Sequence, residues 1–389
     1  MLTAPISSRV DAVEPFHAVV LNQRALALEA AGRSIRKLSI GEPDFPTPDL
    51  VVRAAFDAAL RGETHYTAPL GIPALRTALA ERYGRVDGLE VDPARIAVTT
   101  GASAALLAAL AVLADSGDGF LMADPGYPSN RAFLQMVGAV PELVPVGAAE
   151  RWQLTPELVD AHWTPRTRGV IVASPGNPTG TVIPDDALRG ILDVVRVRGG
   201  TLVVDEIYGG LVYGERPRTA LGLGDDVVVV NSFSKYHCMT GWRIGWMVAP
   251  PPILAAAERL CQHLFISPPT PAQYAALAAL GPEATAIFEA RRAEFMRRRD
   301  YLVPALVGAG FGVPVRPDGA FYVYADCSAF GASEAFAAAL LEEAGVAVTP
   351  GRDFGVQQAD RHVRIAYTCP LDDLADAVTR IRAFAARAA

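Results

Sequence analysis

The sequence predicts an α/β protein whose mostly parallel sheet carries helices on both faces, followed by a smaller α+β domain. Between residues 95 and 248, short apolar runs rich in valine and isoleucine alternate with helical stretches, which is the pattern of a parallel sheet. Polar loops containing proline or glycine follow these runs, so the functional-looking residues fall at one edge of the sheet. From residue 290 onward, strand and helix patterns are mixed, as in an α+β unit.

The strands of the predicted sheet are short, apolar runs bounded by turn-forming residues, which is typical of strands buried on both faces. A helix over 102–114 separates the first run from the second. The final run is a candidate antiparallel strand. The expected strands are 95–99, 120–123, 169–173, 201–204, 227–230 and 243–248.

Outside the sheet, the periodicity of apolar residues predicts several helices and a second group of strands. A helix over 16–31 ends at a glycine, and one long helix is expected over 271–306. The arginine run 297–299 within that long helix is interpreted as a solvated face rather than a phosphate site. The remaining elements are strands at 320–325 and 363–366 and helices at 333–344 and 371–386.

The chain is expected to divide into three parts. Residues 1–47 form an N-terminal segment that packs with the small domain. Residues 48–289 form the large domain with its parallel sheet. Residues 290–389 form the small α+β domain.

Composition narrows the class of protein. Hydrophobic residues make up 51% of the chain and charged residues 20%, so a large core can be buried. The net charge of −7 gives no electrostatic footprint for nucleic acid or an anionic membrane. The longest apolar run, 102–114, is too short to span a bilayer, and no signal peptide is recognised. The four cysteines lack metal-binding or disulfide spacing, so no metal site is predicted and a cytoplasmic protein with reduced thiols is expected.

Lysine is rare in this chain. Of the 35 basic residues only Lys37 and Lys235 are lysines. Lys235 follows the strand 227–230, at the sheet edge where open α/β folds bind ligands, whereas Lys37 sits in a polar pair and is expected to be solvated. If the chemistry needs an amine nucleophile, Lys235 is therefore the candidate.

The turn Thr100-Gly101-Ala102-Ser103 stands between a strand and a helix. A helix start with small residues exposes backbone N–H groups and the positive end of the helix dipole, which suits a phosphate. An ordinary strand-to-helix turn has the same appearance. A nicotinamide dinucleotide site is rejected, because the later glycines of its fingerprint and a Tyr-x-x-x-Lys pair are both missing.

Two charged residues stand in apolar strands. Asp205 directly follows the run 201–204, where a buried carboxylate needs a partner. That partner is either a protonated ring nitrogen or an ordinary helix cap or arginine. Arg364 lies between Val363 and Ile365 and needs a bidentate anionic partner, either a substrate carboxylate or a structural acid.

Together these features resemble the fold-type-I aminotransferases that depend on pyridoxal phosphate, in the class I/II group that includes aspartate and aromatic aminotransferases. The resemblance covers nearly the whole chain, and it rests on the order and spacing of all its motifs rather than on any one. The motifs are Gly-Glu-Pro-Asp-Phe at 41–45, Ser-Pro-Gly-Asn-Pro-Thr-Gly at 174–180, Asp-Glu-Ile-Tyr at 205–208, Ser-Phe-Ser-Lys at 232–235 and Thr-Gly-Trp-Arg-Ile-Gly at 240–245.

The resemblance implies roles around the cofactor ring. Lys235 forms a Schiff base with the cofactor aldehyde and, once released, moves a proton between substrate and cofactor. Asp205 pairs with the ring nitrogen and keeps the ring cationic. Asn177 and Tyr208 hydrogen-bond the phenolic oxygen of the ring, and Tyr127 stacks on its face. Lys235, Asp205 and Tyr208 are the catalytic candidates.

The same resemblance assigns the remaining contacts. Arg364 binds the substrate α-carboxylate, helped by Asn177 and the backbone of Gly41. Tyr66 matches a tyrosine that reaches the phosphate of the other subunit, which implies a homodimer. The cofactor phosphate is held by Ala102, Ser103, Ser232 and Arg243.

The implied activity is transfer of an amino group from an L-amino acid to a 2-oxo acid such as 2-oxoglutarate, by a ping-pong mechanism. Another reaction on the same scaffold, catalysed by a β-lyase, cyclase or synthase, would use the same cofactor residues. A non-enzymatic regulator is disfavoured, because the 40 residues before Gly41 are too few and not basic enough for a DNA-binding module. Cys238 departs from the small residue of many relatives, and no motif selects the substrate side chain.

Overall fold

The computed structural model describes residues 7–388 and contains a seven-stranded sheet of strand order β2-β8-β7-β6-β5-β3-β4. Only β8 runs antiparallel to its neighbours, β2 and β7. The predicted α/β class and the antiparallel sixth strand are both confirmed. The strands are β2 (Ile96–Thr99), β3 (Gly119–Asp124), β4 (Val140–Pro145), β5 (Thr167–Ala173), β6 (Thr201–Asp205), β7 (Val228–Ser232) and β8 (Gly245–Val248).

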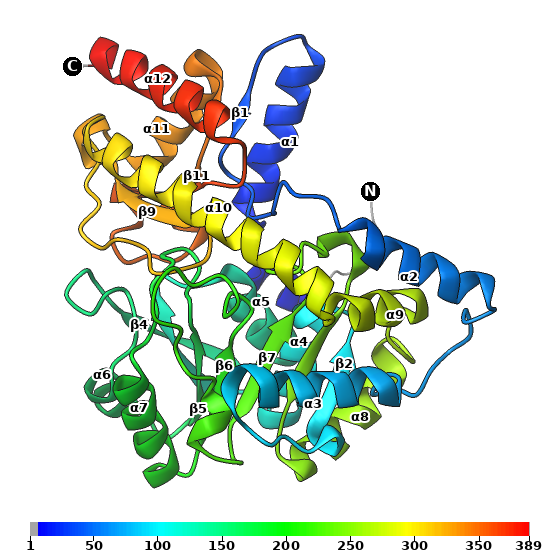
Figure 1. Ribbon diagram of the computed structural model, residues 1–389. Helices are drawn as coiled ribbons and strands as arrows, with labels where there is room; N and C mark the ends of the chain where they lie inside the picture. Colours follow the sequence, from blue (N-terminus) through cyan, green and yellow to red (C-terminus); the bar gives the residue numbers. More distant parts are fainter. Residues whose placement is uncertain (1–6, 389) are drawn as a thin grey trace.

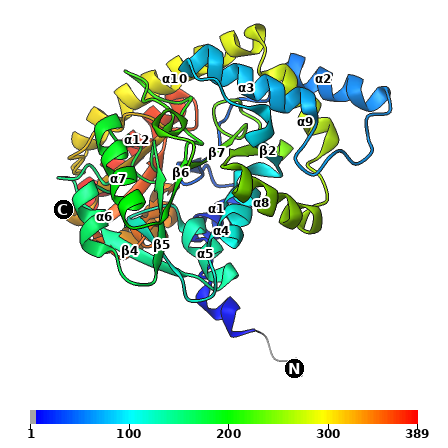
Figure 2. The ribbon, with the colours of Figure 1, turned by 90° about the horizontal axis from the view of Figure 1, so that it is seen from below.

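Helices cover both faces of this sheet, as predicted (Figure 2). Successive side chains of β6 point to opposite faces of the sheet, so Val203 packs in the core on one face whereas Leu202 and Val204 pack in the core on the other. One face carries α4 (Gly101–Leu113), α5 (Pro128–Val137) and α8 (Pro251–Leu264); the other carries α3 (Pro73–Asp87), α6 (Pro156–His162) and α7 (Asp185–Val197).

The edge strand β4 was missed by the sequence analysis. Its six residues include Pro141 and Pro145, and its side chains are mostly only half-buried. Proline cannot donate to a sheet ladder, so a run with two prolines gives a weak strand signal. At the edge of the sheet, paired only with β3, the prolines are tolerated.

A second group of elements sits at the other end of the molecule (Figure 1). Three antiparallel strands in the order β11-β12-β9 pack beside the C-terminal helices. The short strand β1 pairs with β10 and so joins the N-terminal segment to this group. The elements are α1 (His17–Ala30), β1 (Arg36–Lys37), β9 (Tyr322–Asp326), α11 (Ser333–Ala339), β10 (Val346–Ala347), β11 (Thr349–Pro350), β12 (His362–Ala366) and α12 (Leu371–Ala388).

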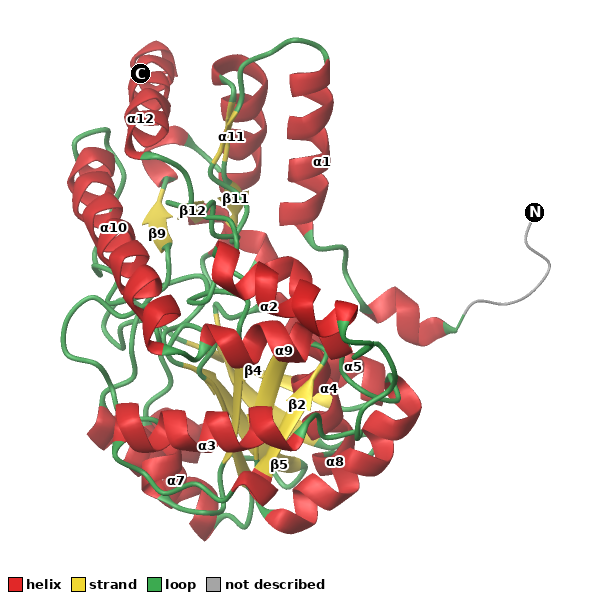
Figure 3. Cartoon of the chain, turned by 45° about the vertical axis from the view of Figure 1, so that its right-hand side comes forward, coloured by secondary structure: helices red, strands yellow, loops and turns green. Residues whose placement is uncertain are grey.

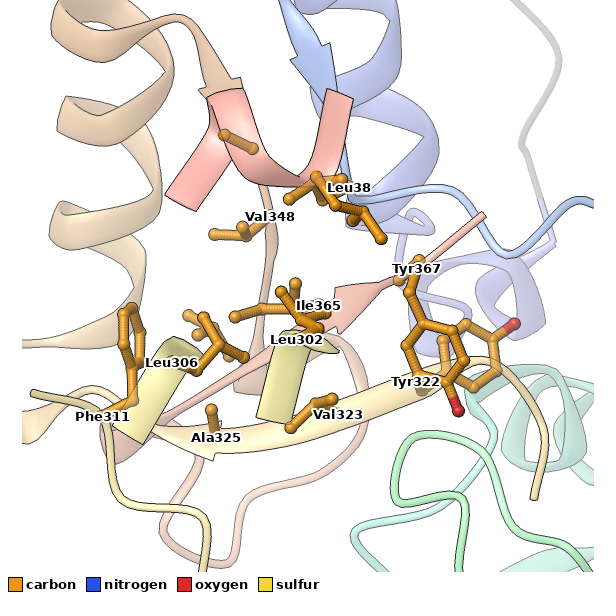
Figure 4. Close-up of a cluster of buried hydrophobic side chains, with 14 of the residues drawn as sticks. Leu38, Leu302, Leu306, Phe311, Tyr322, Val323, Ala325, Val348, Ile365 and Tyr367 are labelled. Atoms are coloured by element: carbon orange, nitrogen blue, oxygen red, sulfur yellow. The ribbon is translucent and has the colours of Figure 1, made fainter. Parts of the chain in front are cut away.

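Figure 4 shows how the N-terminal segment enters this core. Leu38 belongs to one buried cluster with Val323 and Ile365 of the strands and Leu302 and Leu306 of a long helix, all fully buried. Burying five such side chains contributes on the order of 10 kcal/mol of transfer free energy before entropy is subtracted. The domain boundaries at residues 47 and 289 stay predictions; residue 289 lies inside a helix that extends from one group of elements to the other (Figure 3).

The long helix predicted over 271–306 is wrong in one respect, because the structure has two helices there. These are α9 (Thr270–Ala279), which packs on α2 (Asp49–Leu60), and α10 (Pro282–Val307). The break falls at Leu280 and Gly281, because Pro282 has no N–H to continue the first helix and suits the start of the next.

The arginine run at 297–299 is solvated only at Arg297, which corrects the prediction for Arg298 and Arg299. Arg298 and Arg299 are only 3% and 6% exposed. The guanidinium of Arg298 donates to both carboxylate oxygens of Asp44, at 2.7 and 3.0 Å, and to Glu294 at 3.0 Å. Arg299 donates to the carbonyl of Pro317 at 3.0 Å. The local sequence pattern could not indicate this pairing, because Asp44 lies 254 residues from Arg298 in the sequence.

Replacing Arg298 with alanine should therefore destabilise the protein by roughly 2 kcal/mol, because it removes the hydrogen bonds of a buried guanidinium to Asp44 and Glu294. The adjacent Arg297 is the matched control, since its pair with Glu294 is largely solvent-exposed. Arg297→Ala should change the free energy of unfolding by less than about 1 kcal/mol. Urea denaturation of both variants measures the difference, and equal losses would contradict a stabilising role of the buried arginine.

Within residues 7–388 no helix is both long enough and apolar enough to cross a membrane. In the same range no group of three or more His, Cys, Asp or Glu side chains could hold a metal ion. The four cysteines are free, and three of them are buried.

Candidate active site

A cavity of about 230 Å³ opens at the C-terminal ends of β5 and β6. Parallel strands end at the same edge of their sheet, so residues far apart in the sequence meet there. The start of α4 closes one side, and the N-terminal segment and β12 close the other. Nine of the predicted site residues line this cavity: Gly41, Ala102, Ser103, Tyr127, Asn177, Asp205, Tyr208, Lys235 and Arg364.

Lys235 lies in the loop after β7, and its side chain reaches into the cavity. The Nζ atom donates a hydrogen bond to the carbonyl of Gly41 at 2.7 Å. Burial lowers the pKa of Lys235 to about 8, although the Glu42 carboxylate acts in the opposite direction. A much larger fraction of this amine is therefore neutral and nucleophilic at physiological pH than of an ordinary lysine.

Asp205 ends β6 and faces the same cavity. Its Oδ1 accepts a hydrogen bond from the backbone N–H of Ile207 at 2.9 Å. Burial raises the pKa of Asp205 to about 6, while the Ile207 N–H and the Lys235 ammonium favour the charged form. A cationic ring nitrogen at this position would restore the charged carboxylate.

Arg364 is 2% exposed in the middle of β12. Its guanidinium donates to Asn177 Oδ1 at 3.0 Å and to the Ser39 carbonyl at 2.6 Å, and it lies 4.4 Å from the centre of the Tyr322 ring. These partners are neutral, and the buried Nε atom has no hydrogen-bond partner among the described residues. Buried donors are normally paired, so the arrangement favours an anionic ligand over a structural acid.

The start of α4 and Arg243 lie against each other. Gly101 has φ +80°, and a Cβ there would lie 2.5 Å from Nη2 of Arg243, so only glycine leaves room for the guanidinium. Arg243 Nη1 donates to the carbonyl of Thr240 at 2.9 Å. Ser232 is 1% exposed, and its hydroxyl donates within the chain to Ser234 and to the Ile244 carbonyl. Neither Ser232 nor Arg243 lines the cavity itself.

Tyr322 is a polar cavity residue that the sequence did not indicate. Tyr322 on β9 forms a 2.8 Å hydrogen bond with the hydroxyl of Tyr208. Its own hydroxyl approaches the backbone so closely that a Cβ on Gly41 would lie 1.8 Å away. Burial raises the pKa of Tyr208 well above its usual range, so both hydroxyls stay protonated. The only signal was the alternation of tyrosines at 322 and 324 in a predicted strand.

Asp353 was also missed. Its carboxylate accepts hydrogen bonds from the backbone N–H groups of His17 and Ala18, at 2.8 and 3.0 Å, and so fixes the first turn of α1. That turn brings Phe16 against Tyr127, with ring centres 6.4 Å apart, and forms one wall of the cavity. The pairing spans more than 330 residues, so no local pattern indicates it.

Tyr66 and Cys238 also stand apart from the cavity. Tyr66 is 77% exposed and does not line it, so within one chain it contacts no part of this site. Cys238 is 5% exposed and adopts a left-handed φ of 52°, a conformation that glycine adopts without strain. Burial raises the pKa of the Cys238 thiol, which disfavours its reactive thiolate.

Comparison with known proteins gives concordant matches over the whole length. The model of the family "Aminotransferase class I and II" matches residues 33–381. A valine–pyruvate aminotransferase of Mycobacterium tuberculosis is 40% identical, covering 95% of this chain and 96% of that protein. An aspartate aminotransferase of Geobacillus stearothermophilus is 36% identical, covering 97% and 98%. The crystal structure of an aminotransferase from M. tuberculosis superposes with a TM-score of 0.95 at 38% identity, covering 99% and 100% of the two chains.

Proposed function

The chain belongs to the class I and II aminotransferase family and moves an amino group from an amino acid to a 2-oxo acid, and we propose that it does so with pyridoxal phosphate at Lys235. The resemblance drawn from the five motifs is thereby confirmed. The observation that carries the proposal is the convergence of one buried lysine, one buried aspartate and one buried arginine on a single cavity. The relatives include proteins named for aspartate, valine and arginine, so their names do not select the donor.

The residues present fit the cofactor. When bound, pyridoxal phosphate supplies an aldehyde that accepts the amino group and a ring that takes up electrons from the substrate. Asp205 would hold the ring nitrogen, Asn177 and Tyr208 the phenolic oxygen, and Tyr127 the ring face. The Asp205 carboxylate in the cavity and the Arg243 guanidinium beside the start of α4 are the charges that such a cofactor would neutralise. Its phosphate would be held by Ala102, Ser103, Ser232 and Arg243.

Lys235 carries the proton transfer. Its lowered pKa supplies the neutral amine that attacks an aldehyde carbon, and the same Nζ can remove a proton from the substrate Cα once it is free. The 2.7 Å bond to the Gly41 carbonyl holds the amine beside the N-terminal segment in the absence of ligand. A substrate that reaches Arg364 therefore lies close to this base.

Arg364 orients the substrate. A carboxylate can accept from its unpaired Nε atom, while Asn177 and the Ser39 carbonyl keep the guanidinium plane fixed. The Tyr322 ring against its face limits rotation further. Every amino acid and 2-oxo acid carries this carboxylate, so one arginine serves both halves of a ping-pong reaction.

The active unit we propose is a cytoplasmic homodimer. Tyr66 is exposed on one chain and is assigned by resemblance to the phosphate of the partner's site. Analytical ultracentrifugation tests the dimer. A dimer whose Tyr66→Phe variant binds cofactor more weakly supports this assignment, and a fully active monomer would contradict it.

The transaminase reaction is distinguished from lyase, cyclase or synthase chemistry by its stoichiometry. Purified holoenzyme is mixed with an amino donor and no 2-oxo acid. A transaminase converts its cofactor to the amine form once and stops, releasing one oxo acid per site. Product release over many turnovers would assign the scaffold to one of the other reactions.

Arg364→Lys should lower kcat/KM by about 100-fold, because lysine keeps the charge but loses the planar fork. An amine substrate without a carboxylate should react equally slowly with the wild type and with Arg364→Lys, because it has no group for Arg364 to bind. The control is Arg361→Lys, whose side chain is half-exposed and pairs with Asp326 outside the cavity. A carboxylate substrate that reacts equally well with wild type and Arg364→Lys would count against the assignment.

A further inference from the structure

We infer that this site takes monocarboxylic substrates: a donor amino acid with a neutral, apolar side chain and a 2-oxo acid acceptor with a single carboxylate. The inference rests on the proposed function and specifies its substrate class. It also replaces 2-oxoglutarate, the acceptor expected from the sequence, by an acceptor without a second carboxylate.

The cavity contains few cationic side chains. Of the 17 residues that line the cavity, only Lys235 and Arg364 carry positive charge. Lys235 is committed to the amino group, and Arg364 binds the one carboxylate that all substrates share. A second carboxylate on the donor or acceptor therefore meets no positive side chain from this chain's lining of the cavity.

One wall of the cavity is apolar. The first turn of α1 and the segment before Gly41 contribute Phe16, Val19 and Ile40, and the start of α4 and the β6 loop contribute Leu106 and Ile207. These side chains offer no hydrogen-bond donor. A carboxylate placed against them loses its water and gains no partner, whereas an apolar side chain gains contact area.

A buried carboxylate lies behind this apolar wall. The carboxylate of Asp353 supports the first turn of α1 through the N–H groups of His17 and Ala18. It is 3% exposed and interacts electrostatically with Arg364. Arg131, another cation on this side, donates to the Asp353 backbone carbonyl and lines a different cavity. The buried Asp353 carboxylate thus opposes a second negative charge at this wall.

The donor panel tests this directly. With the holoenzyme, kcat/KM should be at least about 100-fold higher for the best of alanine, valine and leucine than for aspartate or glutamate. Pyruvate should exceed 2-oxoglutarate as acceptor by a similar factor. Smaller ratios overturn the inference while leaving the transaminase function intact. If no donor reacts, the proposed function fails and the inference falls with it.

Binding of unreactive acids gives a readout independent of turnover. Calorimetry should detect 3-methylbutanoate binding to the holoenzyme, and succinate should bind at least about 10-fold more weakly. Succinate that binds as tightly as 3-methylbutanoate, or more tightly, overturns the inference.

A matched pair of variants tests the wall itself. Val19 lines the cavity and is 45% exposed, so an arginine can be placed there without burying it. Val19→Arg should raise kcat/KM for aspartate by about 10-fold or more, because it supplies the missing cation. Val20 is 51% exposed and does not line the cavity, so Val20→Arg is the control and should leave the aspartate value unchanged. Equal effects of the two variants would overturn the role of the wall.

Discussion

Replacing Lys235 with alanine should lower the transamination rate by about 10⁴-fold or more, because one residue supplies both the nucleophile and the base. The Nζ atom is buried within the cavity, and its pKa near 8 suits both tasks. The variant should also lose the visible absorbance of lysine-bound cofactor. Stopped-flow kinetics and the absorption spectrum measure the two effects on the same sample.

Lys37 provides the control for this experiment, since it is the only other lysine of the chain. Its ammonium pairs with Glu29 at 2.9 Å on β1, outside the cavity. Lys37→Ala should keep both the spectrum and the rate. A Lys235→Ala protein that is folded, coloured and active would show that this amine is neither the nucleophile nor the base.

Asp205→Asn should lower turnover by about 10³-fold and weaken cofactor binding, because the amide keeps the shape of the carboxylate but loses its charge. The effect should depend on pH. With a pKa of about 6 in the cofactor-free protein, Asp205 is charged above pH 6 and becomes neutral below it. Wild-type affinity for the cofactor should therefore fall as the pH decreases through 6, and this step should be absent in Asp205→Asn.

Glu206, the next residue, is the matched buried acid for this comparison. Its carboxylate accepts from the Thr219 hydroxyl and the Ala220 N–H on the other side of β6, away from the cavity. Glu206→Gln should keep the cofactor affinity and the pH step of the wild type. Equal loss of affinity in the two variants would point to a general effect of burial rather than to pairing with the ring.

Local sequence predicted residues that line the cavity where those residues end strands. Lys235 and Asp205 follow apolar runs, and the topology of a parallel sheet brings the ends of such runs together. The strand pattern around Arg364 likewise indicated an arginine that needs an anion. These positions are readable because one element and its loop determine them.

The residues that sequence reasoning missed depend on contacts between distant segments. Tyr322 matters because it meets Tyr208 and the backbone of Gly41, and Arg298 is buried because Asp44 folds back onto α10. Asp353 hydrogen-bonds the first turn of α1 directly, although more than 330 residues separate the two in the sequence. Periodicity describes one element at a time, so it cannot indicate which side chains the packing of separate elements brings into contact.

The identity of the cofactor-bearing residue can be measured by reduction with borohydride, which turns a Schiff base between lysine and an aldehyde into a stable bond. Holoenzyme is reduced, digested and analysed by mass spectrometry, and the chain offers only two lysines as acceptors. We predict that the added mass of the reduced cofactor appears on the peptide containing Lys235 and is absent from the peptide containing Lys37. Label on Lys37 alone, or on neither peptide of a coloured sample, would contradict the account.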